Sequence, residues 1–364
     1  MTTTAPTMAD GLIAELQERV RAATAAATPL VIHGSGSKAF CRPTVTGEPL
    51  DVSGLTGIVD YEPTELVVTV RAGTPLAELQ AALAAEGQML AFEPPAFAAT
   101  ATLGGTVACG LSGPRRPYAG ALRDFVLGVR CLNGHGEDLR FGGQVMKNVA
   151  GYDIARLQAG AYGRLGVLLE ISFKVLPLPE AETTVALELS PAAAIERMNR
   201  LAGRPLPLSA AAHIDGGLYL RFSGSAAAVA AACADCGGAV LTDAAAFWTA
   251  VREQQHDFFQ TGRPLWRLSL PATAAMPAID GADAADWLID WGGAQRWLRA
   301  EAPATAVHAA AQAAGGWARG WRGVADDRRW PVQPAALQQL QHRLKAAFDP
   351  AAVFNHEADA AGGT

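Results

Sequence analysis

The sequence predicts an α+β fold built from two units, and three observations support that prediction. Short β-like runs alternate with helix signals along the first 180 residues. Glycines concentrate between Leu103 and Gly166, where 14 of the chain's 38 glycines fall. After Pro179, alanine-rich helix patterns become frequent. We therefore expect a first unit over residues 1–180, with lobes at about 1–92 and 93–180, and a smaller α/β, cap-like unit over residues 181–364.

The first lobe reads as a helix followed by short strands. An amphipathic helix fits residues 10–26, which lack the basic and apolar regions of a signal peptide. Thr74 and Pro75 give a cap and a first-position proline for a further helix, which Gly87 ends. The strands expected in this lobe are residues 30–33, 58–61 and 66–71.

The second lobe is expected to contain a β-hairpin and a long strand. The dipeptide Asn133-Gly134 predicts a hairpin between strands at 126–132 and 137–141. A short helix is expected at 152–159 and a long strand at 165–176, after which prolines close the unit.

The pattern of helix and strand signals in the cap-like unit predicts a βαβ-rich domain, and no sequence repeat is found in it. Ser190 and Pro191 predict a helix start, and a last helix is expected at 334–348. All eight tryptophans lie in this unit, either as core residues or as a surface for a partner or substrate. Its expected strands are residues 210–214, 218–222, 239–241 and 266–270.

Composition excludes several classes of protein. The net charge is −6 and no basic stripe occurs, so a nucleic-acid partner is not expected. Five cysteines in a long chain favour a reducing compartment, and we expect a cytoplasmic protein. No apolar run reaches the ~18 residues of a membrane span. The seven histidines lack metal-ligand spacing, so no metal site is expected.

Two glycine-rich segments and one polar turn are the candidate ligand contacts. The loop 34–38 follows a strand, and its amides either form a nest for phosphate oxygens or make a plain tight turn. The ATLGG segment at 101–105 offers a second backbone surface. The KNVAGYD turn at 147–153 holds donors suited to an isoalloxazine ring, or is simply a capped helix start. The CxxC pair at 233–236 ends a helix and is read as two incidental thiols.

Six segments taken together resemble the E subunits of bacterial glycolate oxidases. They are HGSGSK, FEPP, ATLGGTVACG, GPRRPYAGALRDFVLGV, FGGQVMKNVAGYDIARL and GRLGVLLEISFKVLPLP. Those subunits belong to the vanillyl-alcohol-oxidase-type (PCMH-type) FAD-binding superfamily. The resemblance is dense over residues 29–179. It implies a two-lobed PCMH-type FAD-binding domain followed by the cap-like unit.

The resemblance also implies which residues contact FAD. Ser37 stands where covalent flavoproteins of the superfamily carry histidine, so non-covalent FAD is expected. The ending FNHEADAAGGT departs from the family's FNPG, which puts the usual tail contact with the flavin domain in doubt. The residues assigned to FAD are Gly34, Ser35, Gly36, Ser37, Lys38, Thr102, Leu103, Gly104, Gly105, Gly110, Arg116, Asp124, Lys147, Asn148, Gly151, Tyr152, Gly163 and Val167.

The function implied by the resemblance is that of an FAD-binding subunit in a heteromeric glycolate (2-hydroxy acid) oxidase. The implied partners are a D-type flavoprotein subunit and an iron–sulfur F-type subunit, which pass electrons toward quinone. Membrane contact is expected only peripherally, at the cytoplasmic face of the inner membrane, through those partners. Two alternatives remain: a non-catalytic assembly subunit of the complex, or a stand-alone FAD-dependent oxidoreductase on another substrate. No residue stands out as a catalytic base.

Overall fold

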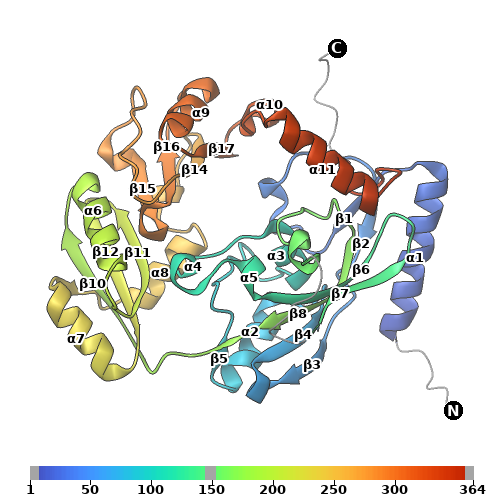
Figure 1. The fold of residues 1–364 in the computed structure, drawn as a ribbon, viewed down its shortest axis with the longest axis horizontal. Coiled ribbons are helices and arrows are strands. Elements are labelled where there is room, and N and C mark those ends of the chain that lie inside the picture. Colours follow the sequence, from blue (N-terminus) through green and yellow to red (C-terminus); the bar gives the residue numbers. More distant parts are fainter. Residues whose placement is uncertain (1–7, 144–152, 357–364) are drawn as a thin grey trace.

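The computed structural model describes residues 8–143 and 153–356, which form two units lying side by side (Figure 1). The first unit contains a five-stranded sheet in the order β3-β4-β8-β6-β7, in which all neighbours are antiparallel. A parallel pair, β1-β2, and a short pair, β5-β9, complete it. Its helices are α1 (Met8–Ala26), α2 (Leu76–Ala85), α3 (Leu103–Cys109), α4 (Arg116–Ala119) and α5 (Leu122–Phe125). Its strands are β1 (Leu30–His33), β2 (Glu48–Asp51), β3 (Ile58–Glu62), β4 (Val67–Arg71), β5 (Gln88–Met89), β6 (Val126–Leu132), β7 (Asp138–Gly142), β8 (Val167–Lys174) and β9 (Leu176–Pro177).

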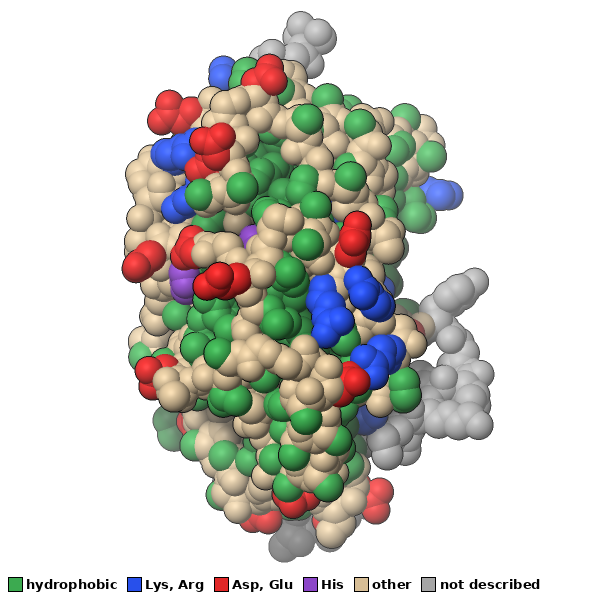
Figure 2. Space-filling view, turned by 90° about the vertical axis from the view of Figure 1, so that its left-hand side faces the viewer, with side chains coloured by type: hydrophobic (Ala, Val, Ile, Leu, Met, Phe, Trp, Pro, Cys, Tyr) green, Lys and Arg blue, Asp and Glu red, His purple; other side chains and the backbone are tan. Residues whose placement is uncertain are grey.

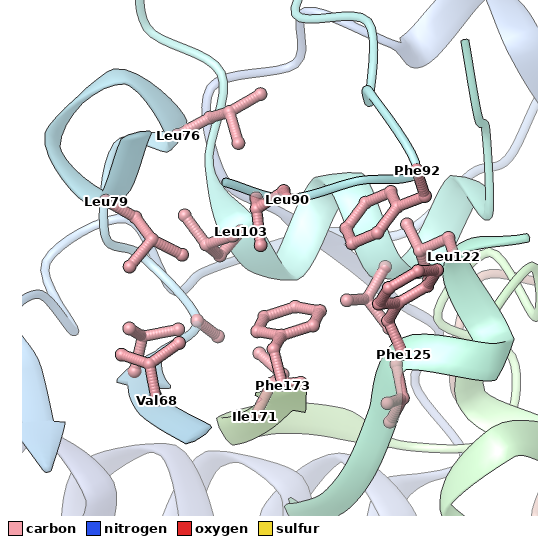
Figure 3. Packing of buried hydrophobic residues seen from close by; sticks show 14 of the residues in the cluster. Val68, Leu76, Leu79, Leu90, Phe92, Leu103, Leu122, Phe125, Ile171 and Phe173 are labelled. Atoms are coloured by element: carbon pink, nitrogen blue, oxygen red, sulfur yellow. The ribbon is translucent and has the colours of Figure 1, made fainter. Parts of the chain in front are cut away.

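The core of this unit lies between the five-stranded sheet and helices α2, α3 and α5 (Figure 3). Phe92, Phe125 and Phe173 pack there with ring centroids 5.4 and 6.1 Å from Phe92. Leu103 points into the same core from the first turn of α3. Since burying one such side chain stabilises a fold by about 1.5–3 kcal/mol, this cluster holds α3 firmly against the sheet. The glycine-rich segment that begins α3 is thereby fixed in place.

The structure confirms the expected strands and helices of the first unit and corrects two details. Helix α2 begins at Leu76 with Pro75 as its cap residue, so Thr74 is not the cap. The Thr74 hydroxyl instead accepts the Gly57 amide at 2.9 Å. The expected short helix at 152–159 is a 3-10 turn at Ala155–Gln158.

The second unit is built on an eight-stranded antiparallel sheet in the order β13-β10-β12-β11-β15-β16-β14-β17. Its strands are β10 (Ala181–Glu188), β11 (Leu208–Ile214), β12 (Gly217–Gly224), β13 (Ala239–Val240), β14 (Leu265–Ser269), β15 (Trp287–Asp290), β16 (Gln295–Arg299) and β17 (Trp317–Arg322). The helices after residue 180 are α6 (Pro191–Ala202), α7 (Ala226–Cys236), α8 (Ala244–Arg252), α9 (Ala304–Ala313), α10 (Asp326–Arg329) and α11 (Ala335–Phe348). Seen from its outer side, this unit carries acidic and basic side chains among hydrophobic ones (Figure 2).

The eight strands divide into two halves with the same topology. In the first half, β10-α6-β11-β12-α7-β13 gives the spatial order 4-1-3-2 of a split βαβ motif. The second half repeats this order with β14 to β17 and α9, while a segment without an α-helix replaces the first helix. The halves meet where His213 of β11 pairs with Ile289 of β15. The unit thus repeats in structure, although the sequence shows no repeat.

The expectation of βαβ units needs correction in one respect. Helices α6 and α7 each join strands that run parallel, but an antiparallel strand lies between the two strands of each pair. The four strands expected in this unit are confirmed, whereas β10, β15, β16 and β17 were not anticipated. Helix α11 then lies over the first unit, and Phe354 pairs in parallel with Leu30 of β1 (Figure 1).

Candidate functional site

A cavity in the first unit brings together the two glycine-rich segments predicted from the sequence. It is lined by the whole loop 34–38, by Thr102, Gly104 and Gly105, and by Gly163. Strand β1 leads into the loop, and the buried start of α3 presents Thr102 and the glycines beside it. The cavity is completed by Ile32, His33, Ala39, Arg42, Val52, Ala72, Ala108, Cys109, Tyr162, Gly166, Leu168 and Asn355.

The two segments touch at Gly34 and Thr102. A Cβ atom placed on Gly34 would lie 2.6 Å from Thr102 Oγ1, well inside contact distance. Thr102 has little freedom to move away, because its side chain is buried and its hydroxyl caps α3 by accepting the Gly105 amide at 3.3 Å. Glycine at position 34 therefore allows the loop and the α3 start to form one continuous wall.

The segments differ in the backbone donors that they offer. Within residues 8–143 and 153–356, the amides of Ser35, Gly36 and Lys38 donate to no protein acceptor. The amides of Leu103 and Gly104, in contrast, donate to the Thr74 and Ala72 carbonyls at 2.9 and 2.7 Å. Amide donors for a ligand are therefore found in the first loop and not at Leu103 or Gly104. The second segment gives a surface without bulky side chains.

A lysine and a thiol lie in the wall of the cavity. Lys38 is buried, and its ammonium donates to the Ala96 carbonyl at 3.2 Å rather than pointing out of the loop. Burial lowers the pKa of Lys38. Burial also raises the pKa of Cys109 to about 11, so this thiol is neutral at physiological pH. A neutral thiol is a poor nucleophile.

Other predicted FAD contacts lie away from this cavity. Leu103 and Val167 are fully buried in hydrophobic clusters. Gly110 ends α3 with a φ of +64°, where a Cβ would meet Gly160 at 2.9 Å. Asp124 accepts the Ala121 amide at 2.9 Å and lies near Arg156.

The remaining predicted contacts lie at the border with the second unit or cannot be placed. The Arg116 guanidinium lies 4.3 Å from the Trp291 ring centroid, across the border between the units. Its neighbour Arg115 is buried and pairs with Glu93 and Glu182 of its own chain. Lys147, Asn148, Gly151 and Tyr152 lie outside the described residues.

Two of the cavity residues that the sequence analysis missed connect the first unit to distant parts of the chain. Tyr162 lines the wall near the second unit, and its hydroxyl accepts Arg319 Nη1 at 2.9 Å. Asn355 accepts the Ile32 amide at 2.8 Å and donates to the Tyr162 carbonyl at 2.6 Å. The doubt about the tail contact is therefore wrong, because Phe354 and Asn355 reach the first unit without the usual proline and glycine. The dipeptide Phe354-Asn355, which this ending shares with the family's FNPG, was the signal in the sequence that pointed to the tail contact.

Asn355→Ala is expected to destabilise the protein by about 1–3 kcal/mol, because the Ile32 amide and Tyr162 carbonyl lose a buried partner. FAD affinity should fall with it, since Asn355 lines the cavity. Denaturant unfolding with and without FAD measures both effects. His356→Ala, a change to the exposed neighbouring side chain, serves as the control. Equal unfolding curves for the two variants would contradict the assigned tail contact.

The described parts of the chain hold no group of three or more His, Cys, Asp or Glu residues placed to bind a metal ion. Within the same parts, no helix has both the length and the apolar character needed to cross a membrane. All five cysteines are free thiols.

Comparison with known proteins identifies the family to which the chain belongs. A family described as "FAD binding domain" matches residues 11–142. Alkyldihydroxyacetonephosphate synthase has a similar fold, with a TM-score of 0.64 at 14% identity over 95% of this chain and 74% of that chain. Glycolate oxidase subunit GlcD of Bacillus subtilis is 32% identical over 43% of this chain and 34% of its own length.

One relative matches from end to end. Glycolate oxidase subunit GlcE of Escherichia coli is 48% identical over 340 residues, which cover 93% of this chain and 95% of that protein. With such identity along both chains, and with an FAD binding domain in its N-terminal part, the chain belongs to the family of glycolate oxidase subunit GlcE.

Proposed function

We propose that this protein is the non-covalent FAD-binding subunit of a heteromeric oxidase for glycolate or a similar 2-hydroxy acid. Residues 1–180 would carry the FAD domain in two lobes, and residues 181–364 the cap together with the segment at Phe354 and Asn355 that returns to the first unit. The contact between Gly34 and Thr102 is the observation that carries the proposal, because it joins two glycine segments around one cavity.

The residues present fit a dinucleotide. The amides of Ser35, Gly36 and Lys38 would donate to the diphosphate, as successive backbone N–H groups do in anion-binding nests. Gly104 and Gly105 would let the dinucleotide lie close to the backbone of α3. When bound, FAD supplies a two-electron acceptor, while the protein binds it, orients it and excludes water.

Two side chains in the cavity support non-covalent binding. Ser37 lines it at the position where covalent relatives carry histidine. Cys109 also lines it, but its thiol is neutral because burial raises its pKa to about 11. A neutral thiol does not readily attack the isoalloxazine ring.

The remaining functional assignments rest on the relatives' names and on the resemblance to glycolate oxidase E subunits. GlcE and GlcD are both named as subunits of glycolate oxidase, which favours an assembly with a D-type flavoprotein. An iron–sulfur F-type subunit would carry electrons from this assembly toward quinone. Any membrane contact would be peripheral, at the cytoplasmic face, through those partners.

Purified chain mixed with FAD and desalted is expected to retain about one FAD per chain and to show flavin absorbance. After acid precipitation the flavin should remain in the supernatant, because no covalent bond holds it. A yellow pellet would show covalent attachment, and a chain that never retains FAD would argue for an assembly subunit. Co-expression with the neighbouring D- and F-type reading frames, with flavin counted per subunit, tests the complex.

A further inference from the structure

A second cavity lies between the two units, beside the first. Phe97, Leu111 and Ser112 line it from the first unit, and Arg267, Asp290 and Gln295 line it from the sheet of the second. The cavities are neighbours along the chain: Cys109 lines one and Leu111 the other.

The segment that carries Phe97 is held firmly on both sides. On the side of the first cavity, Lys38 Nζ donates to the Ala96 carbonyl. On the side of the second unit, Glu253 accepts the Ala96 and Phe97 amides at 3.0 and 2.8 Å. The second cavity therefore has a fixed wall, and its position is set relative to the first.

Among the described residues, no carboxylate forms an ion pair with the Arg267 guanidinium in this cavity. The Arg267 Nε donates to Gln295 Oε1 at 2.6 Å. Within the described residues, neither terminal nitrogen of the guanidinium donates a hydrogen bond to the protein. The direct neighbour of Arg267 on the adjacent strand is Arg319, another cation. Like charges opposite each other on neighbouring strands repel, and a buried unpaired charge is costly. Burial, with Arg319 and Arg116, lowers the pKa of Arg267 to about 9.

Aromatic rings surround this guanidinium and limit what can reach it. The ring centroids of Trp291, Trp297 and Trp321 lie 5.1, 5.9 and 5.6 Å from the Arg267 Cζ atom. Cation–π contacts offset part of the cost of burial, but they leave the N–H donors of the guanidinium unused. The free fork of donors matches the two oxygens of a carboxylate.

Asp290 lies at the other side of Gln295. Its Oδ2 accepts Gln295 Nε2 at 3.3 Å and its Oδ1 accepts the Trp291 amide at 2.7 Å, so the amide of Gln295 bridges Arg267 and Asp290. Burial, followed in effect by the charge of Glu93, raises the pKa of Asp290 to about 7. The next residue, Trp291, has a φ of +54°, which is uncommon for a bulky residue. Strained backbone of this kind is often found at ligand-binding sites.

We propose that Arg267 and Asp290 bind a small 2-hydroxycarboxylate between the two units, with its carboxylate on the Arg267 guanidinium and its hydroxyl on Asp290. The inference rests on the proposed function, which provides FAD in the adjoining cavity and a 2-hydroxy acid as the substrate class. It assigns substrate recognition to this chain itself, through side chains of its cap.

Binding to the FAD-loaded full chain tests the assignment with three probes: glycolate, acetate without the hydroxyl, and ethylene glycol without the carboxylate. The readouts are tryptophan fluorescence, because three tryptophans surround Arg267, and calorimetry. Glycolate should bind tightest, acetate about 10-fold more weakly, and ethylene glycol should give no signal. A wild-type holoprotein that binds none of the three would overturn the proposal while leaving the FAD-binding function intact.

Variants identify the residues. Arg267→Gln should weaken glycolate and acetate alike by about 10- to 100-fold, and Arg267→Lys should restore part of the loss. Asp290→Asn should instead remove the preference for glycolate over acetate. Arg204→Gln, at an exposed arginine of the second unit, is the matched control. FAD content and melting temperature are measured for each variant. If Arg267→Gln loses FAD but keeps its affinity for glycolate, the guanidinium serves the cofactor and the proposal is wrong.

Discussion

Gly34→Val is expected to weaken FAD binding by about 100-fold, which corresponds to ~3 kcal/mol. Even a single Cβ at this position would lie 2.6 Å from Thr102 Oγ1 and 3.2 Å from Thr102 Cγ2. The loop and the α3 start must then separate, and the amides of Ser35 and Gly36 move with the loop. Fluorescence titration of folded protein with FAD measures the loss, and circular dichroism verifies the fold.

A double-mutant cycle separates steric contact from other effects of the substitution. Gly34→Ala and Thr102→Ala should each weaken binding, the second partly through loss of the α3 cap, worth about 1 kcal/mol. In the double variant the alanine has the space left by the threonine hydroxyl, so the losses should not add. Gly11→Ala, with no atom within 4 Å of the new Cβ, is the control and should leave FAD affinity unchanged. Additive losses would show that the two segments do not meet.

The first unit could be predicted largely from the sequence because its signals are local. Turn residues and caps mark most element ends, and glycine density marks the cavity. The sequence did not reveal which amides remain available, because that depends on hydrogen bonds between distant segments. Gly104 illustrates this: its amide is taken by Ala72, and a Cβ there would meet the Ala72 side chain at 2.9 Å.

The second unit was harder to predict because its chemistry arises from pairing across the sheet. Strand β15 is an apolar run that ends in Asp290, and β16 and β17 carry arginines and tryptophans. None of the three shows the regular alternation of apolar and polar residues that marks a half-buried strand. Arg267 and Arg319 are far apart in sequence and become neighbours only through β14 and β17. Asp290 gave a local signal that was missed: a carboxylate inside the apolar run Trp-Leu-Ile-Asp-Trp.

Glu93→Ala is expected to cost about 3–5 kcal/mol of stability, because it removes the central carboxylate of a buried ion network. Glu93 accepts Arg115 Nε at 3.2 Å from its own unit and Arg221 Nη2 at 2.8 Å from β12 of the second unit. Without it, two buried guanidinium groups share Glu182, which is more exposed. Chemical denaturation measures the loss, and Glu188→Ala, at an exposed position on β10, should change stability by less than ~0.5 kcal/mol.

The same network predicts an acid-dependent loss of stability. Burial alone would raise the pKa of Glu93, but the charges of Arg221 and Arg115 outweigh it and hold the pKa below its usual value of 4.5. A carboxylate with a lowered pKa contributes its full stability above the pKa of the unfolded chain, and this contribution is lost as the pH falls through the folded pKa. Glu93→Gln should therefore lower the melting temperature most at neutral pH, and the difference from wild type should shrink in acid. A difference that stays constant down to the acid limit would mean that Glu93 acts through its shape and not through its charge.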